Sequence, residues 1–136
     1  MANTFKLEIV TAEGPAYSED VEMVTLPDVT DQFGVYAQHV PLMTQMEPGE
    51  ITVRRDGRDT FFATGAGLIE VTPTRVSILT DLAVQADKID EAKAEEARQR
   101  AAARLREKIS AEEVASVNAS LARSLAQLKV KRRAHG

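Results

Sequence analysis

The chain has 136 residues, of which 43% are hydrophobic and 28% are charged, and its formal net charge at pH 7 is −4. This length suits one globular core with a small appendage and excludes two full-sized domains. The absence of cysteine excludes disulfides and thiolate metal sites, and neither His39 nor His135 lies near a second ligand in the sequence, so no metal is expected.

Residues 5–81 carry the short apolar patterns of β-strands. Phe5, Leu7 and Ile9 alternate with Lys6 and Glu8, which is the period of a half-buried strand. Similar runs predict further strands at residues 21–26, 51–54, 60–64, 68–71 and 76–79.

Turn residues separate these runs. Arg55–Arg58 contains an Asp-Gly hairpin signal between two predicted strands, and Thr72–Thr74 is a similar turn around a proline. Gly65 and Gly67 lie close together, which indicates a bulge or a close approach of the backbone. Short strands without an intervening helical pattern favour an antiparallel β-sandwich or barrel over a βαβ sheet.

The rest of the chain is helical in character. From residue 89 it has no glycine or proline before Gly136, and it is rich in good helix formers. Ser110 and Glu113 form a capping-box pattern, so a second helix is expected to begin near Ala111. We therefore predict an α+β fold, with a β-sandwich domain over residues 1–84, a C-terminal antiparallel two-helix hairpin over residues 85–136, and helices at about 88–108 and 111–131.

Each predicted helix has one apolar stripe. The first comprises Ala97, Ala101, Leu105 and Ile109, and the second comprises Val114, Val117, Leu121, Leu125 and Leu128. The first stripe is mostly alanine, so the apolar area that the hairpin buries barely offsets the entropy of ordering about forty residues. The hairpin is expected to depend on docking, against the β-domain or a partner, and to be movable.

Charge divides the chain in the same place. Residues 1–86 hold 5 basic and 13 acidic side chains, whereas residues 87–136 hold 12 basic and 8 acidic ones. The basic C-terminal part suits an acidic partner surface. The same charge counts would also result if both parts simply exposed their charged side chains to solvent. Nucleic-acid binding by the basic hairpin is the alternative function, but aromatics are only 4% and none lies in the helical part. No paired-acid or triad pattern supports an enzyme site.

Specific segments resemble a known family. Residues 33–44 read FGVYAQHVPLMT and are followed by Pro48-Gly49, with further matching segments at 10–14, 65–71 and 79–81. With these residues the chain resembles, nearly end to end, the epsilon subunits of bacterial F-type ATP synthases. It departs from the family pattern at Asp31-Gln32 and at Ala37-Gln38.

The resemblance implies a non-catalytic rotor subunit of the central stalk, on the cytoplasmic side of the bacterial inner membrane. The implied partners are the gamma subunit, the c-subunit ring and the alpha/beta catalytic head. No transmembrane segment is expected, because no stretch approaches the roughly 18 apolar residues that span a bilayer. The implied c-ring contacts are Gln32, Gly34, Tyr36 and His39, although His39 also fits a turn histidine bonded to the backbone, and Tyr36 a packing residue.

Some epsilon subunits bind ATP through an Ile/Leu-Asp-x-x-Arg-Ala motif. The corresponding residues here are Ile89, Asp90, Lys93 and Ala94, with Arg123 on the second helix. Lysine replaces the motif's arginine and lacks its planar bidentate fork, and Gln127 stands where binders have another arginine. No cofactor is therefore required, and ATP is a candidate regulatory ligand. Equally, Asp90 suits the first helical turn as a favourable charge, and Lys93 and Arg123 suit a solvated surface.

In the family the hairpin can extend into the catalytic head and block ATP hydrolysis. The resemblance implies inhibitory contacts to the beta subunits from Arg98, Arg100, Arg104, Arg106, Lys108 and Arg123. The basic tail at 129–133 extends this surface, or is a solvated terminus.

Overall fold

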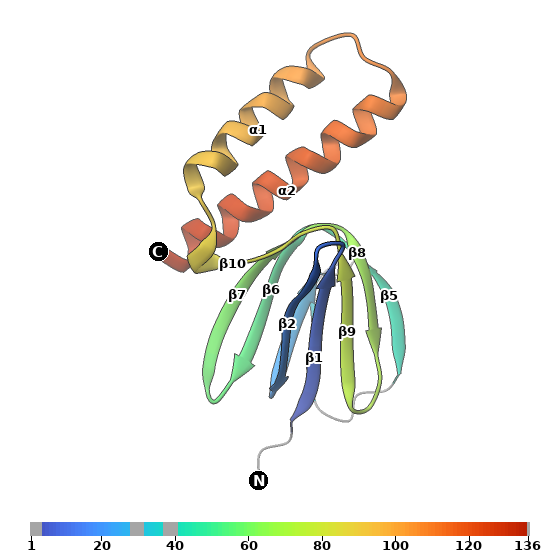
Figure 1. Ribbon diagram of the computed structural model, residues 1–136, viewed down its shortest axis with the longest axis vertical. Coiled ribbons are helices and arrows are strands. Elements are labelled where there is room, and N and C mark those ends of the chain that lie inside the picture. The colour runs from blue at the N-terminus through green and yellow to red at the C-terminus, as the bar shows by residue number, and fades with distance from the viewer. Residues whose placement is uncertain (1–3, 28–31, 37–40, 136) are drawn as a thin grey trace.

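A computed structural model of the chain describes residues 4–27, 32–36 and 41–135. It contains a β-sandwich with a two-helix hairpin on one end, and the first strand, β1 (Phe5–Thr11), begins at the opposite end (Figure 1). The first sheet has the order β2 (Gly14–Val21), β1, β9 (Arg75–Thr80), β8 (Gly67–Val71) and β5 (Leu42–Met46). The second has the order β10 (Ala83–Gln85), β7 (Arg58–Thr64), β6 (Gly49–Arg55), β3 (Met23–Pro27) and β4 (Gln32–Tyr36). The predicted fold class is confirmed.

The sandwich core follows the alternation of the strands. Phe5, Leu7 and Ile9 of β1 are buried, as their period of two predicts. They pack in one cluster with residues from both sheets, among them Val24, Leu26, Ile51, Val53, Phe62, Ile69, Val71, Val76 and Ile78. Neighbouring strands pair antiparallel, except that β1 and β9 pair in parallel.

The single strand predicted at residues 21–26 is wrong. Val21 ends β2 in the first sheet and Met23 begins β3 in the second, so the chain crosses between sheets at Glu22. The sequence conceals this crossing because Val21 and Val24 are both buried, each from its own sheet. Their separation of three residues breaks the period of two.

The hairpin predicted around Arg55–Arg58 is confirmed. β6 and β7 pair from Gly49 to Thr64, and Asp56 and Gly57 form the loop. Both loop residues have positive φ, 54° and 74°, as a two-residue hairpin turn of the primed type requires.

The close approach predicted at the paired glycines is also confirmed. A Cβ atom on Gly67 would lie 2.0 Å from the carbonyl oxygen of Leu79, and one on Gly65 would lie 1.7 Å from a carboxylate oxygen of Asp81. The turn between β7 and β8 can therefore lie against the end of β9 only if residue 67 lacks a side chain, whereas a side chain at residue 65 would displace the Asp81 carboxylate.

The helical part begins with a 3₁₀ turn, η1 (Ala86–Lys88), followed by α1 (Glu91–Leu105) and α2 (Ala111–His135). The first helix is shorter at both ends than residues 88–108. Asp90 accepts a hydrogen bond from the Lys93 N–H (3.1 Å) and so caps the helix after the 3₁₀ turn. Ser110 accepts one from the Glu113 N–H (3.1 Å), the capping-box bond, and α2 begins at Ala111 and extends beyond residue 131.

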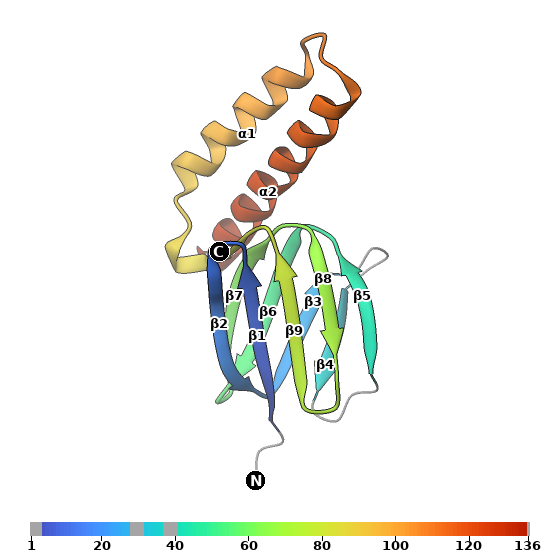
Figure 2. The same ribbon diagram turned by 45° about the vertical axis from the view of Figure 1, so that its right-hand side comes forward.

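The predicted second stripe is only partly buried. Leu128 is buried, but Val114 and Leu125 are exposed, by 36% and 49%. The buried set shifts to Ser124, Ala126, Leu128 and Val130 because α2 lies between α1 and the sandwich (Figure 2), and only its C-terminal half contacts β6, β7 and η1 as well as α1. On α1 the buried residues are Ala94 and Ala101, whereas Ala97 and Leu105 are half-buried.

Candidate functional site

Three of the four residues predicted to contact the c ring lie on one edge strand. Gln32, Gly34 and Tyr36 belong to β4, which pairs with β3 at the edge of the second sheet. Gly34 is exposed. His39 lies outside the described residues. Among the described strands, β4 is therefore an edge of the sandwich that pairs on one side only.

The predicted nucleotide residues lie at the base of the hairpin, and two of them are buried. Ile89 packs in a cluster with Ala63, Ala86, Ala126 and Val130. Ala94 is also buried. Asp90 is the helix cap already described, and Lys93 is exposed.

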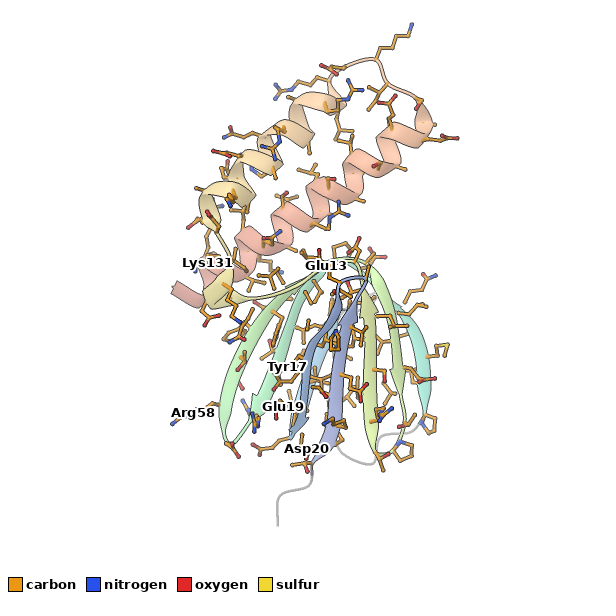
Figure 3. All side chains as sticks on the ribbon, viewed as in Figure 1. Glu13, Tyr17, Glu19, Asp20, Arg58 and Lys131 are labelled. Carbon is orange, nitrogen blue, oxygen red and sulfur yellow. The ribbon has the colours of Figure 1, made fainter. Side chains whose placement is uncertain are left out.

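Arg123 joins the hairpin to the β-domain. Its guanidinium donates to the Asp81 carboxylate at 3.1 Å and to the Ser120 hydroxyl at 3.0 Å. Near the other end of the same contact, the Lys131 ammonium donates to the Ala86 carbonyl at 3.2 Å. In Figure 3 Lys131 lies where α2 meets the segment leading into α1. The Arg123 and Lys131 contacts thus lie on either side of the apolar cluster formed around Ile89, Ala126 and Val130.

Two of the other predicted inhibitory residues are neutralised within the hairpin. Arg98 donates to Glu95, and Arg104 donates to Glu107 and Glu113. With the residues that the structure describes, Arg100, Arg106 and Lys108 form no ion pair, and all three are exposed. This trio therefore keeps its positive charge available to a partner while the hairpin is docked, as do the exposed Lys88, Lys93 and Lys129.

The Arg98 and Arg104 contacts make the hairpin sensitive to acid. Hydrogen bonds from Arg98 lower the pKa of Glu95, and hydrogen bonds from Arg104 lower the pKa of Glu113. A carboxyl whose pKa is lower in the folded chain stabilises it above the pKa of the unfolded state, and this contribution is lost as the pH falls through the folded value. We expect helical circular dichroism at 222 nm to weaken as the pH falls below about 4.

The matched control is the Glu95→Gln, Glu113→Gln double variant, which cannot titrate at these positions. It should lose less helical signal between neutral and acidic pH than the unmodified chain. An identical loss in both chains would show that other carboxyls cause the transition.

The sequence did not predict an apolar patch on the outer face of the first sheet. We call Met43, Leu68 and Leu79 the outer patch; their exposed fractions are 67%, 48% and 55%. Leu68 and Leu79 are cross-strand partners, and Leu79 in turn pairs with Val10. Together with the carboxylates Glu8 and Glu70, these residues line a shallow hollow of about 230 Å³.

An apolar surface of this kind indicates a binding site. Large apolar side chains that gather on one exposed face are typical of a protein interface. Two pairs of adjacent apolar residues, Leu68-Ile69 and Ile78-Leu79, were the signal in the sequence. Successive side chains of a strand point to opposite faces, so one residue of each pair must point out of the core.

Two further hollows, both open to solvent, lie on the helices. One of about 540 Å³ is lined by alanines of α1, by Ser116, Val117 and Ser120 of α2, and by the polar side chains Arg100, Arg104 and Glu107. One of about 360 Å³ is lined by Glu95, Arg98, Leu125, Leu128, Lys129 and Arg132. Across residues 4–27, 32–36 and 41–135, the structure groups no three His, Cys, Asp or Glu side chains in a way that could hold a metal ion. In the same part of the chain no helix is long and apolar enough to cross a membrane.

Two family models match the chain. Residues 4–86 match the family described as ATP synthase, Delta/Epsilon chain, beta-sandwich domain. Residues 87–132 match the one described as ATP synthase, Delta/Epsilon chain, long alpha-helix domain.

Curated relatives match over most of their length. The ATP synthase epsilon chain of Herpetosiphon aurantiacus is 42% identical over 125 residues, which is 92% of each chain. That of Chloroflexus aggregans is 45% identical over 124 residues, covering 91% of this chain and 89% of the relative. That of Laribacter hongkongensis is 37% identical over 139 aligned residues, covering 98% and 99%.

Solved structures share the fold. A chain of the Euglena gracilis mitochondrial ATP synthase superposes with a TM-score of 0.77 at 21% identity, covering 98% of this chain and 82% of that one. A chain from the central stalk and c-ring structure of the Tetrahymena thermophila mitochondrial ATP synthase gives a TM-score of 0.54 at 11% identity, covering 62% and 69%.

Proposed function

Since this chain belongs to the ATP synthase delta/epsilon family, we propose that it is a non-catalytic central-stalk subunit whose β-domain binds the gamma subunit and the c ring and whose hairpin restrains ATP hydrolysis. It works at the cytoplasmic side of the inner membrane, held there by its partners. The observation that carries the proposal is the outer patch, an exposed apolar surface on an otherwise acidic domain.

The outer patch is the proposed contact with the gamma subunit. Its three large side chains are about half to two-thirds exposed in the isolated chain, so covering them with a partner gains free energy. Glu8 and Glu70 line the same hollow, which favours a partner surface that carries basic side chains beside apolar ones. A subunit joined in this way turns with the gamma subunit.

The β4 edge is the proposed contact with the c ring. Gln32, Gly34 and Tyr36 lie on a strand with an unpaired edge, and unpaired backbone groups can accept hydrogen bonds from, or donate them to, a polar loop. The two contacts use different sheets, so one β-domain can hold both partners at once.

The hairpin is the proposed brake on hydrolysis. The buried members of its docking cluster are three alanines, one isoleucine and one valine, with Phe61 and Val84 partly buried against them, and the free energy gained by burying alanine is small. A hairpin held so weakly can leave the β-domain and reach the acidic surfaces of the catalytic head. ATP as a ligand that regulates this movement stays a prediction from the sequence.

Replacing Arg100, Arg106 and Lys108 by alanine should raise ATP hydrolysis by the assembled enzyme several-fold. All three are exposed and form no ion pair with the described residues, so their loss weakens contact with an acidic surface and leaves the docked hairpin intact. The measurement is the steady-state rate of ATP hydrolysis by the complex reconstituted with each chain.

The control for this triple variant replaces Lys6, Arg55 and Arg58 of the β-domain by alanine. It removes the same charge from a part of the chain that the proposed brake does not use, and hydrolysis should not change. Equal rates for both triple variants and the unmodified chain would exclude inhibition through the exposed cations of the hairpin.

A further inference from the structure

The connection between hairpin and β-domain includes an unusual local arrangement at Gly65. The Asp81 carboxylate lies against the Gly65 backbone, where a Cβ atom would come within 1.7 Å of one carboxylate oxygen and 3.4 Å of Arg123 Cγ. The other carboxylate oxygen accepts the hydrogen bond from Arg123 at 3.1 Å. The missing side chain at residue 65 therefore makes room for the ion pair.

Asp81 is held on a fixed support. The Gly65 N–H donates to the Leu82 carbonyl at 3.1 Å. The Thr80 hydroxyl lies within hydrogen-bond distance of the carbonyls of Ala66 and Leu82, at 3.0 and 3.1 Å. These bonds join the turn before β8 to the turn after β9, so the carboxylate is positioned before the hairpin docks.

We propose that Asp81, seated over Gly65, is the docking receptor for Arg123 and sets the fraction of chains whose hairpin is docked on the β-domain, with Gly65 as a positioning residue. This inference rests on the proposed movable hairpin. Because the apolar docking cluster is small, a single ion pair changes the balance between docked and released hairpins measurably. Both side chains are partly exposed, 33% for Arg123 and 48% for Asp81, so the expected effect is about two- to fivefold in the docking equilibrium.

The test uses a single introduced cysteine as a reporter, since the chain has none. Ala126 is 6% exposed and packs in the docking cluster, so the thiol of Ala126→Cys reacts with a maleimide only when the hairpin is released. Leu125→Cys, at a position 49% exposed on the same helix, gives the reference rate for an accessible thiol. The ratio of the two rates measures the released fraction.

Asp81→Asn should raise the reactivity of the reporter about two- to fivefold. Gly65→Ala should raise it at least as much, because its Cβ displaces the carboxylate. The effects should not add in the double variant Gly65→Ala, Asp81→Asn, since each removes the same contact. The charge exchange Asp81→Arg, Arg123→Asp should restore part of the protection.

Three results would overturn the inference: unchanged reactivity in Asp81→Asn, simple addition of the Gly65 and Asp81 effects, or a reporter in the unmodified chain that reacts as fast as Leu125→Cys. Thermal unfolding of each variant identifies any that fail to fold. If Gly65→Ala does not fold, Asp81→Asn still tests the inference, because it introduces no extra volume. Hydrolysis by the assembled enzyme is measured separately. A released hairpin with unchanged hydrolysis supports the docking receptor and contradicts the proposed brake.

Discussion

Gly67→Ala should lower the free energy of unfolding of the β-domain by about 3 kcal/mol. An added Cβ would lie 2.0 Å from the Leu79 carbonyl oxygen and 3.0 Å from the Thr80 Cα. Both obstacles are backbone atoms of β9, which pairs with β8 on one side and β1 on the other. Unlike a long side chain, they cannot rotate away, so the strands must separate locally.

Urea unfolding followed by tyrosine fluorescence measures this effect, because the Tyr17 ring packs edge-on against Phe62 in the sandwich, with ring centroids 5.3 Å apart. Gly34→Ala is the matched control, since the nearest atom to its Cβ, the Met23 Cε, is 3.9 Å away. Both substitutions reduce the entropy of the unfolded chain equally, so their difference isolates the clash. Equal midpoints for the two variants would contradict the close approach at Gly67.

Features encoded within a few residues could be predicted from the sequence. The alternation of Phe5, Leu7 and Ile9 identified β1, the Asp56-Gly57 pair identified the β6–β7 loop, and Ser110 with Glu113 identified the start of α2. Each depends on local backbone preferences that hold in any fold.

Features that depend on distant residues could not be predicted. The Asp81–Arg123 pair joins residues 42 positions apart, and the burial of Ala126 and Val130 depends on where α2 crosses the sandwich. The crossing at Glu22 was missed because two strands of different sheets follow each other directly. In each case the tertiary arrangement decides which side of an element is covered.

The outer patch shows the same limit for the functional site. Leu68 and Leu79 are read from the sequence as ordinary strand residues, and only their pairing across β8 and β9 shows that they lie together on an exposed face. The basic residues of the hairpin were all visible in the sequence. The structure separates them into those engaged in ion pairs, such as Arg98 and Arg104, and those free to meet a partner.

The double variant Leu68→Glu, Leu79→Glu should weaken binding to the gamma subunit by more than about 100-fold. Apolar anchors at the centre of an interface contribute about 2 kcal/mol or more each when removed, and the new carboxylates would add like charges beside Glu8 and Glu70, where burial is costly. The fold should survive, because both leucines are about half exposed in the isolated chain. Titration of each chain into the catalytic head assembled with gamma measures the dissociation constant, and circular dichroism checks the fold.

Leu125→Glu is the matched control for this experiment, because Leu125 and Leu79 are similarly exposed, by 49% and 55%. Leu125 lies on the hairpin, whereas Leu79 lies in the outer patch. The outer-patch variant adds two negative charges and Leu125→Glu adds one, so the single variant Leu79→Glu is measured as well; it differs from Leu125→Glu in location and not in charge. Binding lost by the outer-patch variant and kept by Leu125→Glu would place the gamma subunit on the first sheet. If both variants bind as tightly as the unmodified chain, the outer patch is not the gamma contact and the β-domain must use its other sheet.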